Sequence, residues 1–234
     1  MEIDFYHRLS QGPILADGAM GTEMHRRHNL GVDVCFEHLN LSAPELVRGV
    51  HLDYLEAGAE LIETNTFGAN RVRLERHGLA HAVEEVNHRA VGLAQEARQL
   101  TGQPIWIAGA VGPLGKPLAP LWPGFQAEAR AAFQEQIQAL VEAGVDLLIL
   151  ETFPALAEIQ ETIAAAKSVG NVPIVAHITF TQDGHTLNGE TPEEVAKALA
   201  PLGLAAIGAN CSVGSEHMLS VIKAMAPQCT APLS

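Results

Sequence analysis

Cysteine is scarce in this sequence. The 234 residues include three cysteines, Cys35, Cys211 and Cys229, and no two of them form a C-x-x-C pair. An odd number of cysteines at wide spacing does not make a disulfide framework, so we expect a reducing compartment, the cytoplasm. The eleven histidines show no H-E-x-x-H pattern and do not by themselves indicate a zinc site.

Basic residues are also few, with 14 lysines and arginines against 27 aspartates and glutamates and a formal net charge of -13. A chain this acidic repels phosphate backbones and anionic lipid surfaces, which argues against nucleic acid and membrane partners. No apolar run approaches about 18 residues, so we expect no membrane span. The opening MEIDFYHRLS carries early acids and no apolar core, so we expect no signal peptide.

Aromatic residues make up 5% of the chain, whereas hydrophobic residues of all kinds make up 47%. This mixture favours an α/β protein over a β-sandwich. Short, β-rich apolar runs recur along the chain, as expected of parallel strands that are buried on both faces. The runs are PILADGA (13–19), AELIETNTF (59–67), PIWIAGAVGP (104–113), VDLLILETF (145–153), VPIVAHITF (172–180) and LAAIGANCS (204–212).

Amphipathic stretches with helical spacing separate these runs. Two such stretches each gather apolar residues on one face: Val83, Val86, Ala90, Leu93 and Ala97 in the first, and Phe133, Ile137, Leu140 and Val141 in the second.

Start and stop signals support these helices. The stretches SAPE (42–45) and TPEE (191–194) match the capping-box pattern of a helix start. Gly58 and Gly144 stand where a helix should end before the next strand. We expect a last helix over residues 215–225.

Six β-α units in series fit either a doubly wound open sheet or a (β/α)8 barrel. The first turn reads DGAMGT and lacks the G-x-G-x-x-G fingerprint of nucleotide-binding open sheets. Eight units of about 40 residues would need roughly 300 residues, which suits a barrel. We therefore expect residues 1–234 to form one α/β domain, a TIM barrel that is incomplete at its C-terminal end. It would hold about six units, with the final APLS starting a seventh strand. The segment 113–126, rich in proline and glycine, is either a lid or an ordinary surface loop.

Polar side chains follow the predicted strands, at the carboxyl ends where barrel active sites lie. Strand ends can be polar because loops are solvated. Burying carboxylates directly after apolar runs nevertheless costs free energy, unless they are paired or take part in function. The residues expected on this rim are Asp17, Glu63, Asn65, Gly112, Pro113, Glu151, His177, Thr179, Asn210 and Cys211.

Several separated stretches together resemble the homocysteine S-methyltransferase domain. This family includes the homocysteine-binding module of cobalamin-dependent methionine synthase and the methyltransferase half of proteins fused to methylenetetrahydrofolate reductase. The resemblance extends over essentially the whole chain. It is carried by DGAMGTEM (17–24), CFEHLNLSAPELV (35–47), GAELIETNTFGANRVRLERHGL (58–79), DLLILETF (146–153) and GANCSVGSEHM (208–218).

The resemblance implies zinc-dependent transfer of a methyl group to the thiol of homocysteine, giving methionine. The zinc would be held by three cysteine thiolates, of which Cys211 in the G-x-N-C motif is one. The other two belong to a G-G-C-C motif that this sequence does not contain. The methyl group would derive from 5-methyltetrahydrofolate, with methylcobalamin or the folate bound on further domains.

The resemblance also implies roles for the residues that bind the substrate. Asp17 and Glu151 would hold the homocysteine ammonium group, and the backbone amides of Gly18 and Ala19 its carboxylate. Three further residues, Asn65, Thr66 and Asn210, would line the rim.

Four other polar residues receive weaker interpretations. Glu63 either points into the barrel or pairs structurally. We interpret His177 as a hydrogen-bonded core histidine, and Cys35 and Cys229 as structural thiols.

Thiolate ligands suit this chemistry. A free thiol with a pKa near about 8.5 is mostly protonated at neutral pH, whereas only the thiolate attacks a methyl group well. Zinc lowers the pKa of a bound sulfur and keeps it nucleophilic. Three alternatives stay open: a homocysteine-binding module or fragment that cannot catalyse, a homocysteine methyltransferase that uses S-methylmethionine or betaine, and an unrelated barrel enzyme acting on a phosphorylated ligand.

Overall fold

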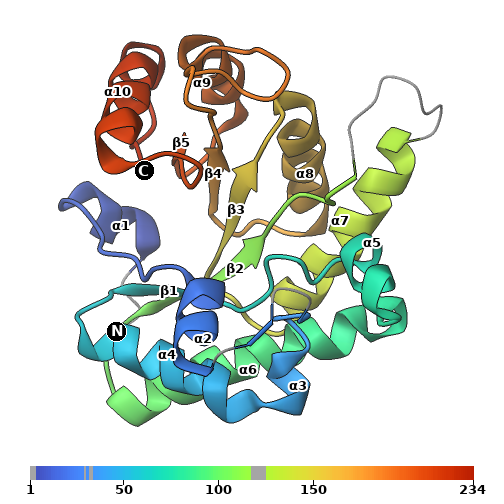
Figure 1. The fold of residues 1–234 in the computed structure, drawn as a ribbon. Coiled ribbons are helices and arrows are strands. Elements are labelled where there is room, and N and C mark those ends of the chain that lie inside the picture. Colours follow the sequence, from blue (N-terminus) through green and yellow to red (C-terminus); the bar gives the residue numbers. More distant parts are fainter. Residues whose placement is uncertain (1–3, 29, 32–33, 117–124) are drawn as a thin grey trace.

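The computed structural model describes residues 4–28, 30–31, 34–116 and 125–234 (Figure 1). Most of the predicted lid or loop, residues 117–124, lies outside the described residues. Within them, five strands form one sheet in the order β1-β2-β3-β4-β5. The strands are β1 (Leu61–Glu63), β2 (Trp106–Val111), β3 (Leu147–Phe153), β4 (Ile174–Ile178) and β5 (Ala206–Ala209).

Each strand pairs in parallel with the next strand along the chain. A doubly wound sheet reverses its strand order at a switch point. Among the described strands there is no such reversal, which favours the barrel over the open sheet.

Two short segments extend the sheet at its edges. Ala16 forms a parallel bridge with Leu61, and Leu233 forms one with Ile207. The residues expected to start a seventh strand therefore lie beside β5 but form an isolated bridge and not a strand within the described residues. The strand expected over residues 13–19 is likewise an isolated bridge. The Asp17 N–H donates to the Leu61 carbonyl at 2.9 Å, and the Leu15 carbonyl accepts the N–H groups of Glu60 and Leu61 at 2.8 and 3.3 Å. Within the described residues the sheet does not close on itself.

The longer helices follow one another around the outside of the sheet (Figure 1). They are α2 (Met20–His28), α4 (Pro44–Glu56), α6 (Val83–Thr101), α7 (Phe125–Glu142), α8 (Leu156–Val169), α9 (Pro192–Leu199) and α10 (Ser215–Met225). Shorter helices and turns are α1 (Phe5–Ser10), α3 (Leu39–Ser42), α5 (Arg71–Leu74), η1 (Glu75–His77), η2 (Ala80–Ala82), η3 (Ala200–Leu202) and η4 (Ala226–Gln228). None of the described helices is long and apolar enough to cross a membrane.

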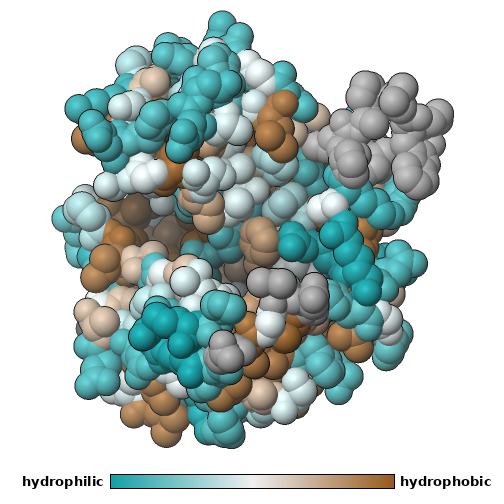
Figure 2. All heavy atoms as spheres, viewed as in Figure 1, coloured by the Kyte–Doolittle hydropathy of each residue, from teal (hydrophilic) through white to brown (hydrophobic). Residues whose placement is uncertain are grey.

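Both faces of the sheet are buried, as the uninterrupted apolar runs predicted. Along β3, Leu148 and Leu150 belong to the large cluster between sheet and helices, and Leu147 and Ile149 to a smaller cluster with Phe5 of α1. The predicted apolar face of α6 is buried along its length. On α7, three of the four predicted residues are buried, and Val141 packs at the edge of the cluster. The space-filling view shows a hollow beside α1 in which apolar atoms are visible (Figure 2).

One of the two predicted capping boxes forms. Thr191 accepts the Glu194 N–H at 3.3 Å, and the Glu194 carboxylate accepts the Thr191 N–H at 2.9 Å. The box predicted at Ser42 is wrong, because Ser42 is the last residue of α3 and donates its hydroxyl to the His38 carbonyl at 3.1 Å. The helix stops at Gly58 and Gly144 are confirmed, with φ of 102° and 90° after α4 and α7. Helix α10 occupies the predicted residues.

Replacement of Phe133 by alanine should destabilise the fold. Its ring is fully buried and lies 6.0 Å, centroid to centroid, from that of Phe153 in β3. The cavity left behind should lower the free energy of unfolding by about 3–5 kcal/mol, measured by urea denaturation. The matched control is Leu100→Ala, because Leu100 is 68% exposed. Equal midpoints for the two variants would contradict the packing described here.

Candidate functional site

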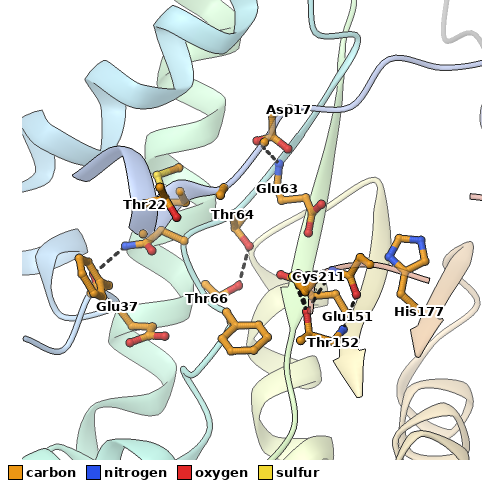
Figure 3. A pocket seen from close by; sticks show the side chains of 18 residues that line it. Asp17, Thr22, Glu37, Glu63, Thr64, Thr66, Glu151, Thr152, His177 and Cys211 are labelled. Atoms are coloured by element: carbon orange, nitrogen blue, oxygen red, sulfur yellow. Dashed lines mark hydrogen bonds between the residues drawn. The ribbon is translucent and has the colours of Figure 1, made fainter. Parts of the chain in front are cut away.

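A cavity of about 620 Å³ lies at the carboxyl ends of the strands. Figure 3 shows the side chains that line it. They are Asp17, Gly18, Ala19, Met20, Gly21, Thr22, Phe36, Glu37, Glu63, Thr64, Asn65, Thr66, Phe67, Glu151, Thr152, His177, Asn210 and Cys211. Neither lysine nor arginine is among these described residues.

Three of the four carboxyl groups that line this cavity, those of Asp17, Glu63 and Glu151, act on one another, and no lysine or arginine faces them among the described lining residues. Asp17 follows the bridge at Ala16, Glu63 ends β1, and Glu151 lies near the end of β3. The Asp17 carboxylate accepts the Glu63 N–H at 2.9 Å, which fixes the two residues side by side. The Oε2 atom of Glu63 is buried without a hydrogen-bond partner in the described structure.

Burial shifts the titration of all three groups. It raises the pKa of Asp17 from 3.8 to about 7, and repulsion from Glu151 adds to this effect. Burial raises the pKa of Glu63 well above its usual value, again with repulsion from Glu151 and Asp17. The pKa of Glu151 is raised by burial and partly lowered by hydrogen bonds from Asn210 and Thr152. The cavity therefore favours protons or another cation beside these carboxyl groups.

Asn210 joins the ends of β3 and β5 across β4, which lies between them. Its amide nitrogen donates to the Glu151 carboxylate and to the Thr152 hydroxyl, both at 3.0 Å. Its amide oxygen accepts the Thr152 N–H at 2.8 Å. Thr152 can present this N–H because the pairing of β3 with β4 shifts register between Leu150 and Phe153, where Thr152 has a φ of 59°. Asn210 thus orients Glu151 toward the cavity.

Cys211 follows Asn210 and is exposed at the cavity. The Thr152 hydroxyl donates to its sulfur at 3.3 Å. Cys211 and Ser212 have φ values of 61° and 60°, a conformation that costs free energy in residues other than glycine. The Ser212 hydroxyl shares a 2.5 Å hydrogen bond with that of Thr179, which helps to hold this backbone.

His177 differs from its prediction. It is buried in β4 and lines the cavity, but neither ring nitrogen has a hydrogen-bond partner in the described structure. It is therefore not a hydrogen-bonded core histidine. Burial lowers its pKa from 6.5 to about 4, so the ring is neutral at pH 7. Its nitrogens can exchange hydrogen bonds with a bound molecule without adding charge.

The side chains of Asn65 and Thr66 form the wall behind the acids. Asn65 donates to the Phe36 carbonyl at 2.7 Å, and the Thr66 hydroxyl donates to the Ala110 carbonyl at 2.7 Å. Gly18 lies against Tyr54, whose hydroxyl would stand 2.8 Å from an added Cβ. No larger residue fits at this turn unless Tyr54 moves.

All eight residues that the sequence assigned to substrate or metal line this one cavity. Gly112, Pro113 and Thr179 do not line it. Sequence reasoning gave no role to Thr152, although it stands beside Glu151 in the quoted LETF stretch. It also missed the walls formed by Phe36, Glu37 and Phe67, which lie within or beside quoted motifs.

The residues present do not fit a zinc ion held by three thiolates. Among the described lining residues Cys211 is the one cysteine. The Cys35 thiol donates to the Glu37 carboxylate at 3.5 Å and does not line the cavity, and Cys229 packs against the core. Within the described residues no group of three or more histidine, cysteine, aspartate or glutamate side chains could hold a metal ion.

A family model for homocysteine S-methyltransferase matches residues 14–234. The chain belongs to the homocysteine S-methyltransferase family. The resemblance carried by the sequence motifs is thereby confirmed.

Relatives agree with this assignment. The methionine synthases of Mycobacterium tuberculosis and Mycobacterium leprae are each 28% identical to this chain over 246 residues and match all of it. The chain spans 21% and 20% of their lengths, about a fifth. The metallated Escherichia coli homocysteine methyltransferase MmuM has a TM-score of 0.84 at 28% identity, covering 97% of this chain and 84% of that one. Its apo form has a TM-score of 0.75 at 27% identity, covering 96% and 82%. These similarities confirm the predicted barrel class.

The raised pKa of Asp17 should make stability depend on pH. The folded protein holds this proton at pH values where the unfolded chain has released it, so the free energy of unfolding should fall as pH rises from about 4 to about 7. Asp17→Asn keeps an acceptor for the Glu63 N–H but cannot ionise. Urea unfolding at about pH 5 and about pH 7.5 should show a smaller fall for the variant. Equal falls would place the titrating group elsewhere.

Proposed function

We propose that this chain binds homocysteine in the cavity and presents its thiol as the acceptor of a methyl group. The observation that carries the proposal is the set of three carboxyl groups that meet without a cation among the described lining residues. An ammonium group would compensate charge that is costly to bury alone. The membership of the homocysteine S-methyltransferase family supports an amino acid with a thiol as that cation.

The ammonium group would lie between Asp17 and Glu151, which are held by the Glu63 N–H and by Asn210 respectively. The carboxylate would lie at the turn before α2. There the N–H groups of Gly18 and Ala19 donate no hydrogen bond within the described residues, and the start of a helix favours an anion. The substrate sulfur would then extend toward Cys211.

The family resemblance adds a zinc ion with Cys211 as one ligand, which would keep the substrate sulfur as a thiolate. The described residues offer no second and third thiolate, so the ion is not part of the binding steps proposed here. A second candidate follows from the same observation: a homocysteine-binding module that does not catalyse by itself. The family resemblance implies 5-methyltetrahydrofolate as the ultimate source of the methyl group, whereas S-methylmethionine and betaine are the alternative donors.

Homocysteine should bind with one site per chain, measured by isothermal titration calorimetry. Glu151→Gln should weaken binding roughly tenfold to hundredfold, because a charged hydrogen bond to the ammonium is lost. The analogue 4-mercaptobutyrate, which lacks the amino group, should bind weakly to both proteins.

The affinity of the wild type for homocysteine should fall as pH drops below about 7, where Asp17 becomes protonated. Glu84→Gln, an exposed site on α6, is the control. Equal affinity for homocysteine and 4-mercaptobutyrate would refute the ammonium site.

Zinc content provides a separate test. Because one thiolate faces the cavity, we expect the zinc-to-protein ratio of the purified, desalted chain to be near zero. The ratio can be measured by atomic emission spectrometry. A ratio near one that falls in Cys211→Ser would contradict this expectation and would mean that other ligands complete the site.

A further inference from the structure

A second cavity, of about 290 Å³, adjoins the first. The two share Phe36, Glu37 and Phe67 as a common wall. The second cavity is otherwise lined by Val34, Cys35, Gly68, Arg73, Arg76 and His77. Its character is basic, whereas that of the first is acidic.

Its two arginines are unusual in this chain. Eight of the ten arginines form ion pairs with aspartate or glutamate in the described structure. Arg73 and Arg76 form none with the described residues, and both line the second cavity. In a chain with a net charge of -13, carboxylates to pair with are abundant. The two guanidinium groups without an ion pair in the described structure therefore lie at the same cavity.

Neutral groups hold both side chains. The Arg73 guanidinium lies over the Phe67 ring, 4.9 Å from its centroid, and donates weakly to the Pro113 carbonyl at 3.5 Å. Arg76 donates to the Gly115 carbonyl. These contacts fix the guanidinium groups without neutralising them. Each has five N–H donors, and one is used in the described structure, so donors remain for a ligand.

Among the groups that line this cavity, two guanidinium groups face the Glu37 carboxylate, a surplus of one positive charge. The buried Glu158 carboxyl lies outside this lining but close enough to Arg73 for the Arg73 charge to lower its pKa, which burial raises to about 7. Glu37 is held by the Gly68 N–H at 2.7 Å. An added Cβ on Gly68 would stand 2.6 Å from the Glu37 carboxylate and 2.9 Å from Arg73 Nε, so both charged groups depend on this glycine for their approach. Burial and the neighbouring Glu37 raise the pKa of the Cys35 thiol to about 11, so this thiol adds no charge. A single carboxylate matches the surplus better than a phosphate dianion.

We propose that Arg73 and Arg76 form a subsite for the carboxylate of the second substrate, the molecule that donates the methyl group. The inference rests on the proposed function, because methylation of homocysteine requires a donor next to it. The acids Asp17, Glu63 and Glu151 disfavour a second carboxylate beside that of homocysteine in the main cavity, whereas the arginines of the adjoining cavity attract one. Bidentate pairing between guanidinium and carboxylate would also orient the donor.

The test uses the wild-type chain and the variants Arg73→Gln, Arg76→Gln and Arg71→Gln. Arg71 lies on the same helix as Arg73 but pairs with Glu135, so its variant controls for the lost charge. The probes are betaine, S-methyl-L-methionine and 5-methyltetrahydrofolate, each with a carboxylate, and choline, which is the carboxylate-free match of betaine. Binding is measured by calorimetry in the absence of homocysteine, which prevents turnover. Homocysteine binding is measured separately with each protein.

We expect at least one of the three carboxylate probes to bind the wild type and to lose roughly tenfold or more in affinity in Arg73→Gln and in Arg76→Gln. The affinity for that probe should be unchanged in Arg71→Gln. Choline should bind more weakly than betaine wherever betaine binds, and homocysteine affinity should be unchanged throughout.

The subsite is refuted if no carboxylate probe binds or if Arg73→Gln and Arg76→Gln bind the probes as the wild type does. If the arginine variants lose homocysteine affinity instead, the cavity holds the carboxylate of homocysteine and not that of a donor. A wild type that does not bind homocysteine at all would fail the proposed function, independently of the arginine results.

Discussion

The structure depends on one electrostatic constraint, the burial of three carboxyl groups in a single cavity. Asp17, Glu63 and Glu151 come from different segments, and only parallel strands in chain order bring the ends of those segments to the same rim. Like charges at close range in a medium of low dielectric constant raise one another's pKa values. The folded protein must therefore hold protons there or accept a cation. Because the hydrophobic core on both sheet faces fixes the strands, the fold keeps these groups together rather than letting them separate.

A small number of hydrogen bonds fix the orientation of the side chains at the strand ends. Asn210 reaches across β4 to fix Glu151 and Thr152, and Thr152 contacts the sulfur of Cys211. The positive φ values at Thr152, Cys211 and Ser212 belong to this arrangement. Left-handed backbone in such residues persists only where surrounding bonds over-determine it. The acid that would hold the ammonium group and the thiol near the substrate sulfur are thus set by the same few contacts.

Much of this fold could be predicted from the sequence because periodicity and turn chemistry act locally. The apolar runs, the α6 face and the Thr191 cap all depend on near neighbours in the chain. The predictions that failed depend on tertiary context. Ser42 has a cap-like sequence, but an upstream carbonyl takes its hydroxyl, and the segment 13–19 pairs through an isolated bridge. The site residues could be predicted as strand ends, whereas the roles of Thr152 and His177 could not. The register shift in β3 is a property of the packed sheet. So is the burial of both His177 ring nitrogens without a hydrogen-bond partner in the described structure.

The distribution of ion pairs separates structural charges from those available to ligands. Most arginines neutralise acids on the outside of the molecule, and exposed pairs of that kind add little stability individually. Two groups of charges without ion pairs in the described structure lie on the two sides of one wall, acids with Glu151 on one side and Arg73 with Arg76 on the other. On the acidic side, where the groups are buried, uncompensated charge lowers stability and a bound cation would offset this cost. An amino acid cation on the acidic side and a carboxylate on the basic side would compensate both, and would place two reactants on either side of Phe36 and Phe67.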